Sequence, residues 1–379
     1  MLKQCLNIMH REIFYMWRDR SLRNLLLIGP LLGLVLFYAT YSAQALKDIP
    51  TAIVDLDQSA ASRELVSNLN YAENLKVLAY PESYDKLEEL VKRGKIVVGI
   101  VIPENFGQKV GLGRQANIFT MVDGSNMIYS TNAVTAVLTV TRTVSAEIGI
   151  KSLLARGINY NQARDVYQTI NFREEPWFNP TLNYAYFLVL ALALNVWQQC
   201  CMLAACMNII GERGRSSWYQ IKSSGISKAK LFFSKSLIHI SVFMLLVLPI
   251  YFLTFVVLKV PLRCNFFIFL LFTLLFVIAL HSIGTLASSF SRSAVDSSRF
   301  GMIIALPSFI LSGYTWPLEA MPHYTQQLTK LLPQTWFFQG INYFTFKNPG
   351  LDFMARYFLI LSVIAVICYG VAALIVSRS

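Results

Sequence analysis

The chain has 379 residues, of which 55% are hydrophobic and 14% are charged, and its formal net charge is +12. A soluble protein carries about 25% charged residues, so this composition excludes an ordinary soluble domain and indicates a lipid bilayer as solvent. The basic excess does not indicate nucleic-acid binding. Residues 47–178 hold 14 basic and 15 acidic residues, and the excess lies beside the apolar runs.

Residues 1–23 have the pattern of an amphipathic helix at the inner membrane face. Leu6, Met9, Ile13 and Trp17 recur at helical spacing with arginines between them, which is typical of interfacial helices. A charged lead-in to the first span is the alternative. The segment Ala43-Gln44-Ala45 mimics a signal cleavage site, but the apolar run before it exceeds the usual length of about 7–15 residues. We therefore predict that residues 24–46 remain as transmembrane helix 1.

Six uncharged runs are long enough to cross the hydrocarbon core, which takes about 20 residues. They are residues 24–46, 176–211, 236–258, 264–291, 300–318 and 357–377. A seventh run, 331–346, is shorter and contains Gln, Thr and Asn, so we interpret it as interfacial or re-entrant. With the N-terminus inside, the cytoplasmic segments carry 14 Lys and Arg against 4 Asp and Glu, and the short outer loops carry 5 against 2. This positive-inside bias places both termini in the cytoplasm.

The predicted fold is a membrane all-α bundle of six transmembrane helices, N-in and C-in, with an extracytoplasmic α/β domain inserted between helices 1 and 2. That domain covers residues 47–178, and residues 179–379 hold helices 2–6. In the domain we predict strands at 51–55, 75–78, 96–102 and 117–122, and helices at 59–68, 83–93, 104–110, 126–155 and 160–169. Strands that alternate with helices indicate a small, partly parallel sheet. The domain has no cysteine, so no disulfide framework holds it.

The sequence contains no phosphate-binding loop, no serine-hydrolase elbow, no zinc-protease motif and no Cys/His cluster. We therefore predict no catalytic residue, no metal site and no ATP site in this chain. Asp55, Asp57 and Ser59 lack the glycine and distal glutamate of a calcium loop, and we interpret them as capping a helix after a strand.

The predicted spans contain almost no ionisable residues. His239 and His281 are the titratable candidates, and each lies near one end of its run. Ionisable residues inside spans usually mark ion or proton pathways. We interpret both histidines as polar interface residues, which argues against proton-coupled transport and favours an energy source outside the chain.

Two polar stretches are informative. Residues 212–235 form a short cytoplasmic loop with glycines at 214 and 225 and a Trp-Tyr pair, a pattern that suits docking into a groove of another protein. A solvated connector is the alternative. Residues 306–340 contain four prolines, two tryptophans and Glu319. Broken helices are tolerated in a membrane only against protein or a wet cavity, so we predict a re-entrant hairpin at about residues 317–346, at the outer mouth of a pathway. An aromatic belt anchor is the alternative.

At these stretches the chain resembles the ABC-2 type exporter permease family, in particular members of the bacterial multidrug and lipid export type with a large extracytoplasmic domain after the first span. The segments LSGYTWPLEAMP and LLPQTWFFQGI resemble the family signature before the last span. The segments ERG at 212–214 and WYQI at 218–221 resemble the loop after the second span. The segments at 55–59, 122–125 and 179–184 are also similar, and the motifs follow the family's order.

The resemblance implies a role for each stretch. Coupling to the ATPase would fall to Glu212, Arg213, Gly214, Trp218, Tyr219, Gln220, Ile221 and Gly225. The outer gate or hairpin would be formed by Gly313, Trp316, Pro317, Glu319, Pro322, Pro333 and Trp336. Residues 1–23 would be the connecting helix, and residues 292–299 a second cytoplasmic contact. The coupling loop departs from the family pattern and is more basic than usual, which indicates a dedicated ATPase.

The resemblance also implies partners. Two ABC ATPase subunits, made as separate chains, would bind ATP and Mg, so this chain would hold no cofactor itself. A second permease copy or a close paralogue would complete the pathway, surrounded by membrane lipid and without nucleic acid. We thus predict a transport subunit of an ATP-driven exporter in a bacterial cell (plasma or inner) membrane, multi-pass, with an amphiphilic or hydrophobic substrate. A membrane-anchored binding or assembly factor acting through its outer domain, and an ion-coupled secondary carrier, are the alternatives.

Overall fold

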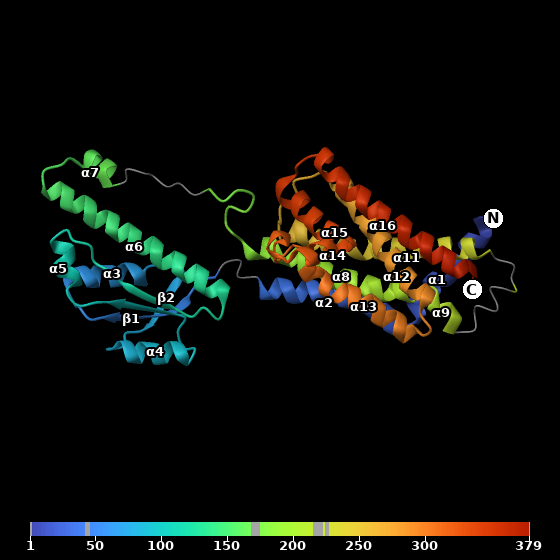
Figure 1. Cartoon of the computed structure of the whole chain (residues 1–379), viewed down its shortest axis with the longest axis horizontal. Helices are drawn as coiled ribbons and strands as arrows, with labels where there is room; N and C mark the ends of the chain where they lie inside the picture. Colours follow the sequence, from blue (N-terminus) through green and yellow to red (C-terminus); the bar gives the residue numbers. More distant parts are fainter. Residues whose placement is uncertain (1, 42–45, 168–174, 215–222, 224–226, 379) are drawn as a thin grey trace. The chain divides into compact units, whose positions relative to one another are not determined.

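The computed structural model describes residues 2–41, 46–167, 175–214, 223 and 227–378. It divides into two compact units (Figure 1). Unit 1 holds Met1–Gln44 and Pro176–Ser379, and unit 2 holds Ala45–Glu175. The predicted strands and helices of the inserted domain all lie in unit 2, and the predicted spans lie in unit 1.

Unit 2 is built on a four-stranded sheet with the order β2-β1-β3-β4. The strands are β1 (Ile49–Asp55), β2 (Leu75–Ala79), β3 (Val98–Ile102) and β4 (Phe119–Val122). Strand β1 runs parallel to β2 and β3, whereas β4 is antiparallel to β3. The prediction of a partly parallel sheet is therefore confirmed.

Helices cover both faces of this sheet. One face packs on α3 (Ala60–Asn70), α5 (Phe106–Gly111) and α6 (Met127–Ala155), and the other packs on α4 (Tyr84–Lys92). Side chains alternate between the faces along a strand: Ile49 and Ile53 of β1 join the first core, while Ala52 and Val54 join the second. Helix α7 (Tyr160–Tyr167) follows α6 and packs against it.

Capping explains the acidic loop after β1. Ser59 is the N-cap of α3 and accepts a hydrogen bond from the backbone N–H of Ser62 at 3.1 Å. Asp55 Oδ1 accepts from the N–H groups of residues 57 and 58, and Asp57 Oδ2 accepts from the N–H of Gly107. The prediction of a helix cap is confirmed for Ser59. Asp55 instead satisfies backbone donors of the turn, and Asp57 satisfies a donor in the first turn of α5.

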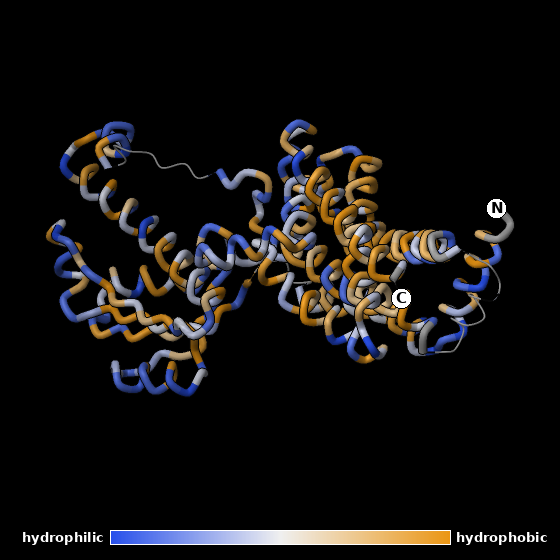
Figure 2. Tube along the Cα trace, turned by 45° about the vertical axis from the view of Figure 1, so that its right-hand side comes forward, coloured by the Kyte–Doolittle hydropathy of each residue, from blue (hydrophilic) through white to orange (hydrophobic). Residues whose placement is uncertain are grey.

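Unit 1 is a helical bundle. Its long helices are α2 (Arg20–Thr40), α8 (Tyr184–Cys206), α11 (Lys228–Phe252), α12 (Phe266–Phe290), α13 (Ala294–Leu311) and α16 (Leu351–Arg378). Its shorter elements are α1 (Leu2–Arg18), α9 (Ile210–Gly214), η1 (Leu253–Val257), η2 (Leu318–Ala320), α14 (His323–Thr329), α15 (Pro333–Asn342) and η3 (Tyr343–Lys347). Figure 2 shows hydrophobic residues along the long helices, with hydrophilic residues toward their ends.

Seven helices in the described part of the chain are long and apolar enough to cross a membrane. Six of them lie in unit 1 and match the six predicted runs. The seventh is α6, which lies in unit 2 and packs on its sheet through Ala133, Val137 and Val144. The count of six crossing helices and the orientation of the termini therefore stay predictions.

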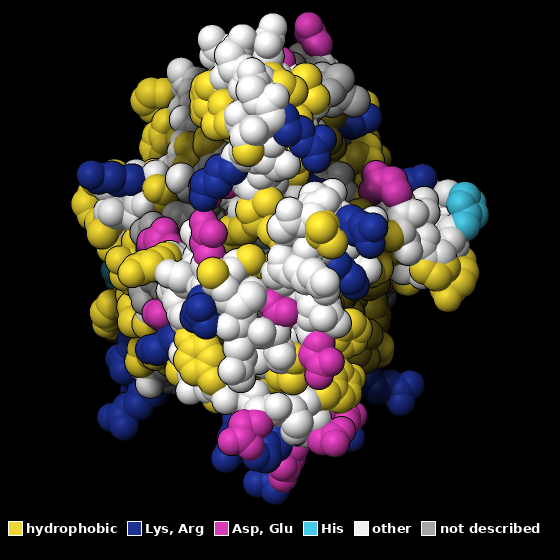
Figure 3. All heavy atoms as spheres, turned by 90° about the vertical axis from the view of Figure 1, so that its left-hand side faces the viewer, with side chains coloured by type: hydrophobic (Ala, Val, Ile, Leu, Met, Phe, Trp, Pro, Cys, Tyr) yellow, Lys and Arg dark blue, Asp and Glu magenta, His cyan; other side chains and the backbone are white. Residues whose placement is uncertain are grey.

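On the face shown in Figure 3, acidic and basic side chains are interspersed.

Helix α8 is the centre of the unit 1 core. It packs against α2, α11, α12 and α13, and Trp197 on it is fully buried and donates to the carbonyl of Phe243 at 3.3 Å. Gly29 and Gly33 of α2 face it one turn apart. A Cβ at Gly29 would lie 2.8 Å from Cys200 Sγ. Small residues at this spacing let two helix backbones approach closely in a membrane.

Helix α1 ends at a sharp break before the first long helix. Asp19 is the N-cap of α2 and accepts from the backbone N–H groups of Ser21 and Leu22. The first long helix therefore begins at Arg20, four residues before the predicted start, because the cap and not the last charge sets its beginning.

Candidate functional site

The buried face of α1 carries a carboxylate. Ile8, Glu12 and Met16 follow one another at four-residue spacing and are 4%, 2% and 6% exposed. Residues four apart share a helix face, and this face packs on α11. The other side of α1 leaves Phe14 and Trp17 largely exposed. The amphipathic helix thus combines an exposed aromatic face with a buried acidic group.

Lys235 of α11 lies between two carboxylates. Its Nζ is 2.9 Å from Glu12 Oε2 and 2.8 Å from Glu212 Oε1. The side chain of Lys235 is 5% exposed, and those of Glu12 and Glu212 are 2% and 10% exposed. Arg11 of α1 also pairs with Glu212. Two cations thus face two anions, which is how buried charges are tolerated away from water.

This ion-pair network joins the two ends of the predicted coupling loop. Glu212 and Lys235 are the first and last residues of the 212–235 segment, and their side chains are in direct contact. Glu212 lies on α9 directly after α8, and Lys235 lies in the second turn of α11. Because both also meet residues of α1, the network joins the amphipathic helix to both ends of this segment.

A pair of buried histidines extends the network into the bundle. His239 lies one turn after Lys235 on the same face of α11. Its Nε2 is 3.0 Å from Glu12 Oε1, and its Nδ1 is 3.1 Å from His281 Nε2 of α12. His281 Nδ1 is 2.7 Å from the hydroxyl of Tyr369 on α16 and 3.2 Å from Thr285 Oγ1. His239 and His281 are 2% and 0% exposed.

Glu12 fixes one donor in this series of hydrogen bonds. The ionised carboxylate can only accept, so His239 Nε2 donates to it. The roles in the contact between the two imidazoles and in the contact with Tyr369 follow from the tautomers. Each ring nitrogen lies within hydrogen-bond distance of a partner.

Glu12 remains ionised. Burial raises the pKa of Glu12, but the hydrogen bond from His239 and the charge of Lys235 outweigh this effect and lower the pKa to about 2. Groups that stabilise the charged form of a carboxylate lower its pKa. At neutral pH Glu12 is therefore a fixed negative charge in the network.

The network also reaches the end of α8. Thr285, which contacts His281, accepts from Asn208 Nδ2 at 3.0 Å. Ser288 of α12 accepts from the backbone N–H groups of residues 209 and 210 at 3.0 and 2.9 Å. Side chains of α12 thus hold the chain where α8 ends and α9 begins. The connection is continuous from α1 through α11 and α12 to α9.

The structure buries both His239 and His281 inside the bundle, and their interpretation as polar interface residues stays a prediction. Sequence reasoning missed Glu12, Lys235 and Tyr369. A signal was present: Lys235 and His239 are four residues apart, and His281, Thr285 and Ser288 follow helical spacing. Two polar stripes on neighbouring apolar helices indicate that they face each other.

The structure describes only part of the predicted coupling residues. Glu212 lies in the network, and Arg213 and Gly214 lie on α9. Trp218, Tyr219, Gln220, Ile221 and Gly225 lie outside the described residues. Helix α11 begins at Lys228 with Ser227 as its N-cap, so the last part of the predicted loop is helical.

The predicted outer hairpin is a series of short elements. Gly313 follows α13 with φ +82°, Trp316 and Pro317 are exposed, and Glu319 lies on the exposed η2 turn. Pro322 precedes α14, and Pro333 is the first residue of α15. The indole of Trp336 donates to the carbonyl of Lys330 at 2.9 Å, which closes the turn between α14 and α15.

Within the hairpin, α15 is part of the bundle core. Its Phe337, Phe338 and Ile341 are fully buried. Gln334 of α15 donates to Gln198 of α8 at 3.2 Å, and Gln198 in turn donates to the carbonyl of Ala305 on α13 at 3.2 Å. The structure therefore joins the hairpin to α8, whose other end leads to the ion-pair network.

Comparisons with known proteins agree with this architecture. Residues 20–374 match the family model described as "ABC-2 family transporter protein". The chain is 25% identical over 378 residues to the inner membrane transport permease YhhJ of Escherichia coli (strain K12), covering 98% of this chain and 96% of the relative. It is 20% identical over 354 residues to the probable multidrug ABC transporter permease YbhR of the same organism, covering 91% and 90%.

A third relative, the probable multidrug ABC transporter permease YbhS of the same strain, is 22% identical over 262 residues and covers 67% of this chain and 66% of the relative. These relatives and the membrane-capable helices identify a multi-pass inner membrane protein. Since the family model matches most of its length, the chain belongs to the ABC-2 family of transporter proteins.

Proposed function

We propose that this chain is the permease subunit of an ATP-driven exporter and that the ion-pair network transmits the ATPase motion to its membrane helices. The observation that carries the proposal is the contact of Lys235 with both Glu12 and Glu212. Through it, a movement of the 212–235 segment acts on α1 and α11 together.

Two ATPase subunits on separate chains bind ATP and Mg²⁺ in this proposal, and a second permease copy or a close paralogue completes the pathway. The family to which the chain belongs supports ABC ATPases as partners. The residues around Trp218 and Gly225 dock on the ATPase. Closure of the ATPase pair displaces this segment, and the two permease bundles respond by rigid-body movement, a common form of switching.

The network suits this role because breaking its contacts is costly. Truncating one member of a buried ion pair leaves an uncompensated charge, which costs about 3–5 kcal/mol. A displacement at the ATPase surface is therefore transmitted through Glu212 and Lys235 rather than absorbed at their contact. The hairpin at residues 317–346 acts as the outer gate, and its link to Gln198 on α8 supports this part of the proposal.

The substrate in this proposal is amphiphilic or hydrophobic, which is consistent with relatives named as multidrug ABC transporter permeases. The test combines co-purification with efflux. We expect the tagged chain to co-purify with an ABC ATPase and to lower the accumulation of a lipophilic dye in cells, with a dependence on ATP. Transport by the purified chain alone would contradict the proposal.

A linker variant tests the coupling role directly. Replacing residues 218–221 and Gly225 by Gly and Ser is expected to abolish ATP-dependent efflux while the chain remains in the membrane. The matched control replaces residues 92–95, an exposed segment of unit 2 with the length of residues 218–221, and should retain coupling. Wild-type efflux in the first variant would show that this segment does not couple the two proteins.

One observation favours a second function. The series of hydrogen bonds from Glu12 through His239 and His281 to Tyr369 has the elements of a proton relay. An ion-coupled carrier would need such a relay. This alternative predicts substrate movement by the purified chain in liposomes with an imposed pH gradient and no ATP. Loss of that movement in a His281→Ala variant would support it.

A further inference from the structure

Unit 2 contains a cavity that the coupling function does not use. Its volume is about 580 Å³, within the range of about 300–1,000 Å³ that is usual for small-molecule sites. The walls come from α3, α5, the segment after α5, α6 and α7. Every lining residue belongs to unit 2, so the cavity depends on this unit alone.

The interior of the cavity is largely apolar. Leu65, Phe106, Val144 and Ile148 line it from three different helices. The residues of α6 reach it because its helical period places positions 141, 144, 145, 148, 149 and 152 on one side. An apolar surface of this kind binds hydrocarbon by excluding water from it.

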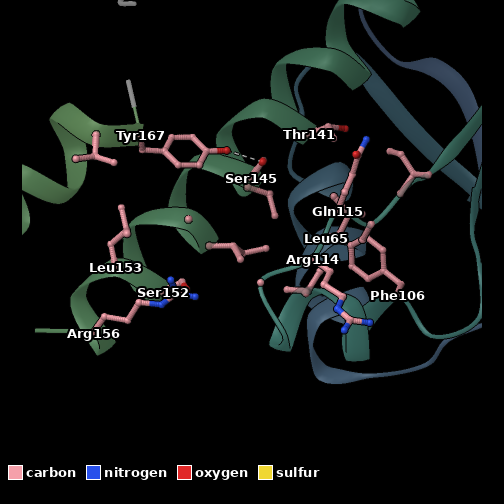
Figure 4. Close-up of a pocket in the computed structure, with 18 residues that line it drawn as sticks. Leu65, Phe106, Arg114, Gln115, Thr141, Ser145, Ser152, Leu153, Arg156 and Tyr167 are labelled. Atoms are coloured by element: carbon pink, nitrogen blue, oxygen red, sulfur yellow. Dashed lines mark hydrogen bonds between the residues drawn. The ribbon is translucent and has the colours of Figure 1, made fainter. Parts of the chain in front are cut away.

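Tyr167 forms one side of the cavity. Its hydroxyl lies 2.6 Å from Ser145 Oγ, and Figure 4 shows the ring reaching from α7 toward α6. The ring lies directly over Gly149, where a Cβ would collide with it. The absence of a side chain at Gly149 therefore allows the ring to approach α6.

Two arginines from opposite walls give the cavity a charged end. Arg156 is the C-cap of α6, and Arg114 lies on the segment after α5. The Arg156 guanidinium reaches across toward this segment, since a Cβ at Gly113 would lie 3.6 Å from Arg156 Nη2. Figure 4 shows both side chains at the same end of the cavity.

The described charged side chains that line this cavity are all positive. Its described lining includes Arg114 and Arg156 and no carboxylate. The nearby Lys151 of α6 does not line the cavity and pairs with Glu64 at 3.2 Å, so the two arginines are the cations of the described lining. An apolar cavity with guanidinium groups at one end complements a molecule with a hydrocarbon tail and an anionic head, because guanidinium binds carboxylate and phosphate oxygens well.

We propose that the unit 2 cavity binds a single-chain amphiphile with an anionic head group, whose tail lies against Phe106 and Ile148 and whose head group meets Arg114 and Arg156. If the bound amphiphile is also the exported substrate, the site deepens the proposed function. Binding itself requires neither the ATPase nor nucleotide, and it is tested in their absence.

The test uses the full chain in nanodiscs of zwitterionic lipid and a photoactivatable palmitate that carries a diazirine on its tail. Irradiation followed by mass spectrometry is expected to place crosslinks on the α6 segment 141–153 and on residues 106–110. Unlabelled palmitate should remove these crosslinks, whereas hexadecyltrimethylammonium, which has the same tail and a cationic head, should not.

Charge variants test the head-group contact. The double variant Arg114→Gln/Arg156→Gln is expected to lower this crosslinking about tenfold, because it removes both guanidinium partners of the head group and both positions are solvent-exposed. The matched control is Arg142→Gln, an exposed arginine on the same helix that does not line the cavity. The crosslinking of this control variant should equal that of the wild type.

A variant that narrows the cavity tests the tail contact separately. Ser152→Phe fills space on the α6 wall and should lower the crosslinking while both arginines are kept. Circular dichroism should show that every variant retains its fold.

Three results would overturn the proposal. The first is equal labelling of the double variant and the wild type, the second is equal competition by the cationic amphiphile, and the third is crosslinking confined to unit 1 helices. Protection by excess phosphatidylglycerol in the nanodisc at the same level as palmitate would overturn the single-chain assignment. None of these results depends on export, so they leave the proposed function to its own test.

Discussion

Removing the lysine at the centre of the ion-pair network should destabilise unit 1 strongly. In a Lys235→Met variant, Glu12 keeps His239 as a partner and Glu212 keeps Arg11. Both carboxylates nonetheless lose their contact with the ammonium group while they stay buried. Met fills a similar volume, so the variant tests the charge and not the packing.

The structure sets the size of this effect. Truncating one partner of a buried ion pair costs about 3–5 kcal/mol, and the surviving partners place this variant at the lower end. The pKa of Glu12 agrees with this direction. The hydrogen bond from His239 and the charge of Lys235 together lower the pKa from 4.5 to about 2, and the variant removes only the part that comes from Lys235. We therefore expect a loss of about 3 kcal/mol in the free energy of unfolding.

The assay is unfolding in mixed micelles with increasing dodecyl sulfate, followed by tryptophan fluorescence. The matched control is Arg299→Met, which breaks the exposed pair of Arg299 and Asp296 at 3.7 Å. Exposed pairs contribute about 0–1 kcal/mol. In the double variant Glu12→Gln/Lys235→Met the loss should be smaller than the sum of the single losses, because the two sites are coupled. A Lys235→Met protein as stable as the Arg299→Met protein would refute the reasoning.

Three further predictions concern Glu12, the helix contact at Gly29 and the cap of α3. Because the pKa of Glu12 is lowered from 4.5 to about 2, its stabilising contribution is fully present above pH 4.5 and is lost as the pH falls toward 2. The difference in unfolding free energy between the wild type and Glu12→Gln should shrink over that window, and a constant difference would contradict the pairing. Gly29→Leu should lower the free energy of unfolding by about 1–3 kcal/mol, because it overpacks α2 against Cys200. Gly370→Leu is the control and should be neutral in the same unfolding assay, because a Cβ there meets nothing within 4 Å. Equal effects of the two variants would disprove the close approach of α2 and α8. Ser59→Ala removes the N-cap of α3 and should lower the stability of unit 2 by about 1 kcal/mol, measured by hydrogen exchange in α3; unchanged exchange there would show that the cap is dispensable.

Several features of the fold follow from local sequence and were predicted from it. The uncharged runs specify long apolar helices because a backbone in lipid must satisfy its own hydrogen bonds. In unit 2, the Val/Ile run at 96–102 indicated the strand observed as Val98–Ile102, since it is buried on both faces. Ser59 marked the start of α3 because a helix needs a side-chain acceptor there.

The helix starts near charged residues were less predictable. The first long helix was expected to begin at residue 24, directly after the last arginine of the N-terminal segment. In the structure it begins at Arg20, after the Asp19 cap. Likewise, Lys235 looked like the end of a loop because it precedes the apolar run, but it lies well inside α11. A charge ends an apolar run in the sequence without ending the helix, and the buried Lys235 is accommodated by the carboxylates of Glu12 and Glu212.

The class of protein, the apolar helices and the elements of the inserted unit were thus predictable from local sequence, because each depends on residues close together in the chain. The ion pairs and hydrogen bonds of the network were not. Glu12, Glu212, Lys235, His281 and Tyr369 lie far apart along the sequence and meet because α1, α9, α11, α12 and α16 pack together. Whether a buried charge is paired depends on which helix faces it, and helix packing sets that.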